Sequence, residues 1–144
     1  MDINEQYGLW RVEMILQERF NRELMLKGVA VQDPHTTLID PHCRIDHGVR
    51  IEGGSTIINS VIEANVLVEN FCRIINSEIG INTQLKQGTS IEDARMGRDC
   101  NVGPYARVRS GTHLADGVWI GNFVEIKNSI IGSGTGSCSN SAIV

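Results

Sequence analysis

An aliphatic side chain recurs every five or six residues from Ile39 onward, and this repeat limits what the chain can fold into more than any other feature. The residue two places before each aliphatic position is mostly small or β-branched, as at Cys43, Ser55 and Thr83. Alternate side chains of a strand point to opposite faces, so both positions face inward. The repeated positions are Ile39, Ile45, Ile51, Ile57, Ile62, Val68, Ile74, Ile79, Leu85, Ile91, Met96, Val102, Val108, Leu114, Ile120, Ile126 and Ile131.

Three steps of the repeat make one coil of 17 or 18 residues. The segments IINSVIEANV at 57, IINSEIGINT at 74 and IKNSIIGSGT at 126 align on this period, and the shorter step falls in the same third of the coil each time. Turns between the sides need Gly, Asn or Asp, which tolerate positive φ. The pattern predicts an all-β solenoid, a triangular parallel β-helix of about six coils. Its coils start at Ile39, Ile57, Ile74, Ile91, Val108 and Ile126.

The N-terminal segment has a different period. Residues of about 5–27 predict an α-helix, because apolar side chains recur at spacings of three and four, and Gly28 follows as a stop. We therefore expect a helix in residues 1–28 and the β-helix in residues 29–144. The periodic apolar residues of the helix are Leu9, Val12, Leu16, Phe20 and Leu24.

Composition excludes several classes of protein. The net charge is −4 without a basic stripe, so we expect no nucleic-acid partner. No apolar run approaches the roughly 18 residues of a membrane span, and the opening MDINEQYG is unlike a secretory signal. We expect no membrane partner and a cytoplasmic protein.

The cysteines show no CxxC pairing, so we expect no zinc site and no other metal. Three of them occupy the small inward position of the repeat, which predicts buried structural thiols with little part in catalysis. The four cysteines are Cys43, Cys72, Cys100 and Cys138.

The stretch GPYARVRSGTHLADGVWIGNFVEIKNSIIGSGT, residues 103–135, resembles one family in particular. It is similar to the acetyltransferase domain of the bacterial bifunctional N-acetylglucosamine-1-phosphate uridyltransferase / glucosamine-1-phosphate acetyltransferases, above all in its RxRxG and GNFVEIK strings. KGVAVQDPHTTLID, IINSVIE and the helix before them extend the resemblance to roughly residues 10–135. The resemblance implies a left-handed β-helix, a homotrimer, and acetyl transfer from acetyl-coenzyme A to glucosamine 1-phosphate for UDP-N-acetylglucosamine biosynthesis.

The resemblance also implies a binding site for a phosphosugar. Arg109 and Lys127 match the family's arginine and lysine that contact the sugar phosphate. They are 18 residues apart, so they are expected to stack on adjacent coils, where two cations can clamp one phosphate. The competing interpretation is a pair of solvated surface charges.

The sequence departs from the family at the catalytic base. The family carries His in a string like GTKANHLSYIG, whereas the aligned string here is GTGSCSNSAIV, with Ser139 at the His position and Gly136 at a lysine position. The N-terminal nucleotidyltransferase domain and the later coils that build the coenzyme A cleft have no counterpart before Val144. We therefore expect a truncated domain with an incomplete active site and no catalytic residue. The alternatives are a non-catalytic trimeric scaffold or phosphosugar-binding module, and a degenerate gene product.

The histidines are candidates for two other roles. His113 lies between Arg109 and Lys127 in the chain, at an expected turn, and is a candidate replacement base. His42, His47 and Asp40 form a conceivable metal site, although their spacing favours different faces or turns. Solvated turn residues are the competing interpretation for both.

Two aromatic residues give a physical reason for the trimer. Trp119 and Phe123 are expected at exposed turn-side positions beside Lys127, where they would leave apolar surface bare in a monomer. The alternative is that the N-terminal helix of the same chain covers them.

Overall fold

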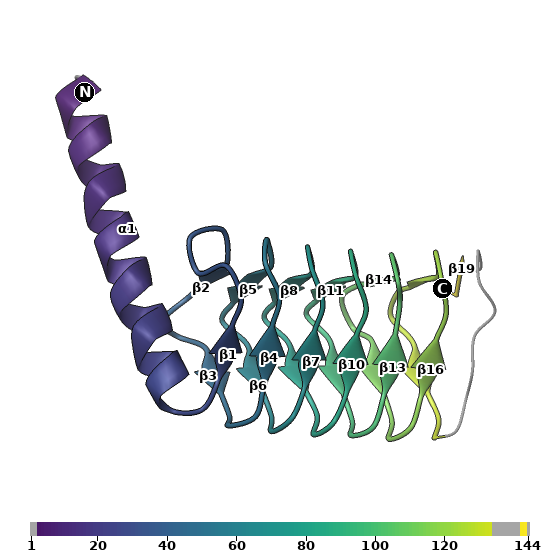
Figure 1. Ribbon diagram of the computed structural model, residues 1–144. Helices are drawn as coiled ribbons and strands as arrows, with labels where there is room; N and C mark the ends of the chain where they lie inside the picture. Colours follow the sequence, from purple (N-terminus) through teal and green to yellow (C-terminus); the bar gives the residue numbers. More distant parts are fainter. Residues whose placement is uncertain (1–2, 134–141, 144) are drawn as a thin grey trace.

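The computed structural model describes residues 3–133 and 142–143, which form one helix and a left-handed parallel β-helix of about six coils (Figure 1). Helix α1 spans Ile3–Leu26, close to the expected 5–27, and stands at the N-terminal end of the solenoid. Short strands then alternate among three parallel sheets, here named A, B and C, so that each coil contributes one strand to each sheet.

Sheet A contains β1 (Ala30–Val31), β4 (Arg50–Ile51), β7 (Leu67–Val68), β10 (Gln84–Leu85), β13 (Asn101–Val102) and β16 (Trp119–Ile120). Sheet B contains β2 (Leu38–Ile39), β5 (Thr56–Ile58), β8 (Arg73–Ile75), β11 (Ser90–Glu92), β14 (Arg107–Val108), β17 (Glu125–Ile126) and β19 (Ala142–Ile143). Sheet C contains β3 (Arg44–Ile45), β6 (Val61–Ile62), β9 (Glu78–Ile79), β12 (Arg95–Met96), β15 (His113–Leu114) and β18 (Ile130–Ile131).

The register of sheet B confirms the predicted coil period. Ile39 pairs with Ile57, and the pairing then passes through Ile74 and Ile91 to Val108 and Ile126. These are the predicted coil starts, so the aliphatic positions stack in a column. Each of the six side chains is completely buried, which gives the narrow prism a continuous apolar core.

The thiols that the sequence placed inside the solenoid are buried there. Burial raises the pKa of Cys72 to about 12, and burial also raises the pKa of Cys43 and of Cys100. A protonated, desolvated thiol is a poor nucleophile, so the structural role predicted for these residues is confirmed. Cys138 lies outside the described residues.

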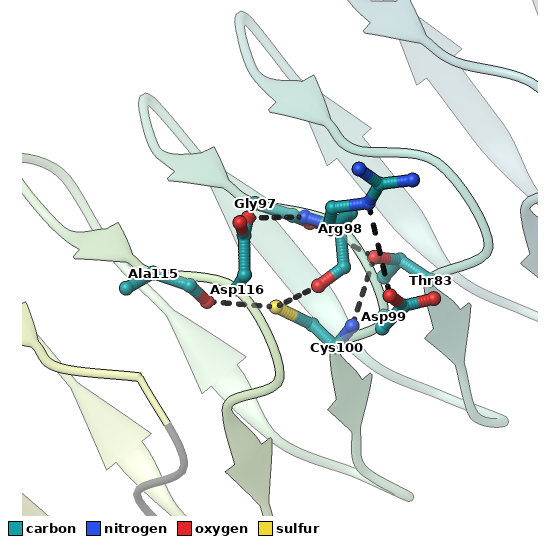
Figure 2. Close-up of polar contacts among 7 residues, drawn as sticks. All are labelled: Thr83, Gly97, Arg98, Asp99, Cys100, Ala115 and Asp116. Atoms are coloured by element: carbon teal, nitrogen blue, oxygen red, sulfur yellow. Dashed lines mark hydrogen bonds and ion pairs between the residues drawn. The ribbon is translucent and has the colours of Figure 1, made fainter.

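The surroundings of Cys100 show how a turn links successive coils (Figure 2). The Cys100 amide donates to Thr83 Oγ1 at 3.2 Å on the preceding coil, and its thiol donates to the Ala115 carbonyl at 3.2 Å on the following coil. The Arg98 amide donates to Asp116 Oδ1 at 2.9 Å, again across one coil step. Side chains therefore satisfy backbone groups that the short strands leave without a partner.

Aromatic and glycine residues alternate along the edge between sheets A and B. Phe71, Tyr105 and Phe123 all have positive φ, as do the glycines of the same column, Gly54 and Gly88. A Cβ on Gly54 would collide with the Phe71 ring, and a Cβ on Gly88 would collide with the Tyr105 ring. The glycines therefore make room for the aromatic ring one coil later, and Tyr105 and Phe123 stack with ring centroids 5.6 Å apart.

Helix α1 closes the N-terminal end of the solenoid through two amide side chains. Asn21 is completely buried, and its Nδ2 donates to the Pro34 and Thr37 carbonyls at 3.1 and 3.4 Å. Gln17 Nε2 donates to Asn21 Oδ1 at 2.9 Å and to the Ile39 carbonyl at 3.3 Å. Carbonyls of the first coil that have no earlier coil to pair with are thus satisfied.

Helix α1 does not cover the aromatic residues of the last coils, so that alternative is wrong. The helix contacts β1 and β2, while Trp119 and Phe123 lie near the far end of the prism and are 60% and 56% exposed (Figure 1). Trp119 is also not a turn residue, because it belongs to β16 and points outward from sheet A. Within the part of the chain that the structure describes, no helix is long and apolar enough to cross a membrane.

Candidate functional site

Arg109 and Lys127 lie in adjacent coils, at the ends of neighbouring strands of sheet B. Val108 and Ile126 pair in the ladder between β14 and β17, and each cation follows directly after one of them. The Arg109 amide donates to the Ile126 carbonyl at 2.8 Å, which fixes the two backbones side by side. The inward positions hold buried Val108 and Ile126, so both cations are carried on the outer face.

The Arg109 side chain already has an acidic partner. Its Nη1 lies 3.0 Å from Oε1 of Glu125, and the two side chains are 38% and 44% exposed. Glu125 begins β17 and lies outward on the same face as Arg109. An ion pair this exposed contributes little to stability.

Four side chains lie next to one another on the outer face of strands β14 and β17 and directly after them. We call these residues the anion face: Arg107, Arg109, Glu125 and Lys127. Arg107 pairs in register with Glu125 on the next coil, just as Arg109 neighbours Lys127. Three cations against one carboxylate leave a net charge of +2, whereas the whole chain carries −4. A doubly charged anion such as a phosphate monoester complements this face.

His113 does not lie at a turn between the two cations, contrary to the expectation. It lies in β15 of sheet C, whereas Arg109 and Lys127 follow strands of sheet B. His113 is exposed and borders a polar hollow of about 420 Å³ whose walls include Glu78, Asp93 and Arg95. The structure therefore separates this imidazole from the anion face by one edge of the prism.

The histidines of the first coil do not converge on a metal site. Asp40 lies in the turn between β2 and β3, where its Oδ1 accepts from the His42 amide at 3.2 Å, while His47 lies in the next turn, between β3 and β4. Among residues 3–133 and 142–143, no three His, Cys, Asp or Glu side chains are grouped to hold a metal ion. Gly136 and Ser139 lie outside the described residues.

Residues 25–135 match the model of a family described as the GMPPB C-terminal domain. The chain belongs to this family. The matched segment runs from the end of helix α1 through all but the last part of the β-helix, so it includes the anion face.

Individual proteins are also similar to this chain in sequence. The chain is 39% identical over 143 residues to the bifunctional protein GlmU of Heliobacterium modesticaldum, a match that covers 94% of this chain and 30% of that protein. It is 42% identical over 134 residues to the bifunctional protein GlmU of Cellvibrio japonicus, with 87% and 29% covered. The chain thus spans about 30% of the length of these curated relatives, and the resemblance stated from the RxRxG and GNFVEIK strings is confirmed.

A solved structure supports the fold independently. The acetyltransferase domain of PglB from Neisseria gonorrhoeae FA1090 superposes with a TM-score of 0.68 at 18% identity, over 79% of this chain and 60% of that one. At this identity the likeness concerns the β-helix alone.

Sequence reasoning missed Glu125 and Arg107 as members of the site. Arg107 belongs to the RxRxG string and Glu125 to the GNFVEIK string, so both lie within the motifs that carry the resemblance. The signal that could have found them is the coil period itself, because a shift of 18 residues puts Arg107 next to Glu125 and Arg109 next to Lys127.

Proposed function

We propose that this chain is an acetyltransferase-type hexapeptide domain that binds a phosphorylated amino sugar, such as glucosamine 1-phosphate, on the anion face. The observation that carries the proposal is the register that sets Arg109 beside Lys127 on adjacent coils. Two cations at equivalent positions of adjacent coils, on an otherwise acidic protein, favour the binding of a phosphate over that of a neutral sugar. The similarity to GlmU proteins supports an amino-sugar phosphate as the substrate class.

Acetyl-coenzyme A is the acetyl donor that the same similarity suggests. The polar hollow beside His113 does not fit it, because Glu78 and Asp93 line that hollow and would repel the phosphates of a coenzyme.

The catalytic step is expected to be slow or absent in this chain. Ser139 stands where the resemblance puts the histidine base, and a serine hydroxyl does not accept a proton near neutral pH as imidazole does. This observation favours a second candidate function, a phosphosugar-binding module that performs no transfer. The two candidates share the anion face and differ only in the chemistry that follows binding.

Calorimetric titration with glucosamine 1-phosphate tests the shared part. We expect binding that Arg109→Ala and Lys127→Ala each weaken at least tenfold. Arg44→Ala is the control, because Arg44 is an exposed arginine on sheet C, outside the anion face, and should leave binding unchanged. Equal binding by all three variants, or none by the wild type, would contradict the proposal.

A transfer assay with acetyl-coenzyme A separates the two candidates. Turnover of glucosamine 1-phosphate above background by the wild type supports the enzyme. Binding without turnover supports the module, and an increase of turnover in Ser139→His would show that the missing base alone separates them.

We also propose that the β-helix assembles as a homotrimer. Trp119, Phe123 and Tyr105 are exposed by about half of their surface and lie on two neighbouring coils, those that start at Ile91 and Val108, which leaves apolar surface that a monomer would expose to water. Light scattering that gives the mass of a single chain at all concentrations would contradict the trimer.

A further inference from the structure

A hollow of about 470 Å³ lies between helix α1 and the first coil, at the end of the solenoid opposite to the anion face (Figure 1). Its apolar lining includes Trp10 and Leu16 from the helix, and Leu38 and Pro41 from β2 and the turn after it. Small-molecule sites in proteins have volumes of roughly 300–1,000 Å³ and mostly apolar walls. The hollow therefore has the size and the lining of a small-molecule site, and we call it the helix hollow.

Glu13 supplies the only carboxylate among the described residues that line the helix hollow, and neither Lys nor Arg belongs to that lining. Glu13 is exposed, and the described part of the chain gives its carboxylate no hydrogen bond or ion pair. Trp10 lies three residues before Glu13, so the indole and the carboxylate occupy the same face of the helix. A free carboxylate beside an aromatic ring attracts a cation through its own charge and through the ring face.

Gln17 adds a hydrogen-bond acceptor to the same helix face, four residues after Glu13. Its Nε2 donates to Asn21 Oδ1 at 2.9 Å and to the Ile39 carbonyl at 3.3 Å, which uses both hydrogens of the amide. Because a carbonyl can only accept, the amide cannot be turned round, and Oε1 remains an acceptor. The helix wall of the hollow therefore offers acceptors to a ligand.

The loop wall of the hollow offers few donors. Thr36 Oγ1 donates to Asp33 Oδ2 at 2.8 Å, and Thr37 Oγ1 donates to the Gln32 carbonyl at 2.9 Å, so both hydroxyl hydrogens are used within the loop. Among the described residues of this wall, the imidazole of His35 is the other side chain that can donate. A ligand that brings its own donors therefore fits better than one that needs them from the protein.

We propose that the helix hollow binds a small organic ammonium ion with an apolar body, the class of an arylalkyl amine. The ammonium group lies beside Glu13 and the Trp10 ring and donates to the carboxylate and to Gln17 Oε1. The apolar body packs against Leu38 and Pro41, where it removes apolar surface from water. An anion of the same shape is repelled by Glu13, so the site selects its ligand by charge. The helix hollow is separate from the anion face, and its occupation does not depend on the phosphosugar.

A neighbouring hollow of about 290 Å³ on the same helix provides a comparison. Its lining includes Glu18 and Arg22, a carboxylate and a guanidinium four residues apart, whose charges compensate each other. The two hollows share Met14 and His35, so they differ in charge more than in position. Glu18 is therefore the matched control for Glu13, because both are exposed carboxylates of helix α1 beside a hollow.

The two tryptophans of the chain provide a direct test, because Trp10 lines the helix hollow and Trp119 lies in β16, at the other end of sheet A. Proton–nitrogen NMR spectra of the whole chain give one indole signal for each, assigned with Trp10→Phe. The probe is 2-phenylethylamine at about pH 7.5, where the amine is protonated and a free imidazole is mostly neutral. We expect the Trp10 signal to shift saturably and the Trp119 signal to stay in place.

The charge of the ligand and the charge of Glu13 are then varied separately. The anion 3-phenylpropionate has nearly the same shape as the amine and should bind at least tenfold more weakly. Glu13→Gln should weaken binding of the amine about two- to fivefold, the size of one exposed ion pair, and should leave binding of the neutral 2-phenylethanol unchanged. Glu18→Gln should change neither affinity.

A Trp10 signal that does not shift saturably overturns the proposal, and so does equal binding of 2-phenylethylamine and 3-phenylpropionate. An equal loss of affinity in Glu13→Gln and Glu18→Gln would mean that the acidic helix as a whole attracts the amine, which would overturn the assignment to the helix hollow.

Discussion

The guanidinium of Arg109 and the carboxylate of Glu125 form an ion pair of 3.0 Å that crosses from one coil to the next on the outer face of sheet B. The same face carries Arg107 and Lys127, for which the structure records no ion pair among the described residues. A phosphate that binds Arg109 must therefore compete with a carboxylate that is already in place. Glu125 lowers the net positive charge of the anion face before a ligand binds. A ligand can reach Lys127 without displacing a carboxylate.

Replacing Glu125 should strengthen anion binding. In Glu125→Gln the net charge of the anion face rises by one and the competitor of the phosphate is removed, so we expect orthophosphate and glucosamine 1-phosphate to bind about three- to tenfold more tightly at low salt. Calorimetry at two ionic strengths measures the effect.

Glu78→Gln is the matched control for that change. Glu78 forms a similar exposed ion pair with Arg95, at 3.2 Å, but on sheet C. It should leave phosphate binding unchanged. Weaker binding in Glu125→Gln alone would mean that Glu125 holds Arg109 in its binding position instead of competing with the ligand.

The amide cap of the first coil should contribute measurably to stability. Asn21→Leu keeps the branching and the number of heavy atoms of the side chain but removes the amide donor, which leaves the Pro34 and Thr37 carbonyls without this partner. We expect the free energy of unfolding to fall by about 2–3 kcal/mol, the cost of leaving buried polar groups unpaired. Urea denaturation measures it, with exposed Arg22→Leu as the control. Equal stability of the two variants would show that water replaces Asn21 at no cost.

The sequence was sufficient for the fold because one inward position repeats along the whole solenoid. Ile39, Ile74 and Ile126 all occupy the same inward position. The register can therefore be assigned separately in each coil, and a wrong assignment in one coil does not shift the next. The outward residues follow no such rule. His113 and Trp119 were both expected at turns, yet both lie in strands and point outward, because a strand of two residues leaves its first position exposed.

The candidate site was predicted only in part for a related reason. Arg109 and Lys127 were found because a resemblance pointed to them. The ion pair between Arg109 and Glu125 spans 16 residues, which is off the coil period, because the arginine reaches diagonally back across the ladder. Periodicity gives neighbours in register, whereas the reach of a long side chain is decided by local charge.

The thiol of Cys72 should make stability depend on pH in alkaline solution. Burial raises its pKa to about 12 in the folded chain, against 9.0 as the ordinary value. Because the folded pKa is the higher one, this contribution is complete below about pH 9 and is lost as the pH rises towards about 12, since the unfolded chain releases its proton first.

The slope that follows is at most about 1.4 kcal/mol per pH unit for one thiol. Urea denaturation between pH 8 and 10.5, the lower part of the window that the raised pKa defines, should show a decline that is shallower in Cys72→Ala. The thiol should also stay unreactive towards a disulfide reagent until the chain unfolds. Rapid modification of native Cys72 would contradict its burial.

The aromatic column at the edge between sheets A and B should make one glycine far less replaceable than another. Gly88 and Gly117 have nearly the same backbone, with φ of 71° and 70°, but a Cβ on Gly88 meets the Tyr105 ring and a Cβ on Gly117 meets no atom within 4 Å. Gly117→Ala should therefore cost about 1–2 kcal/mol of stability from the left-handed conformation alone. Gly88→Ala should cost about 1 kcal/mol more, because it also displaces a stacked ring. Thermal or urea unfolding of the two variants gives the difference, and in a Tyr105→Ala background it should vanish. A difference that persists without the ring would place its origin in the backbone rather than in the aromatic column.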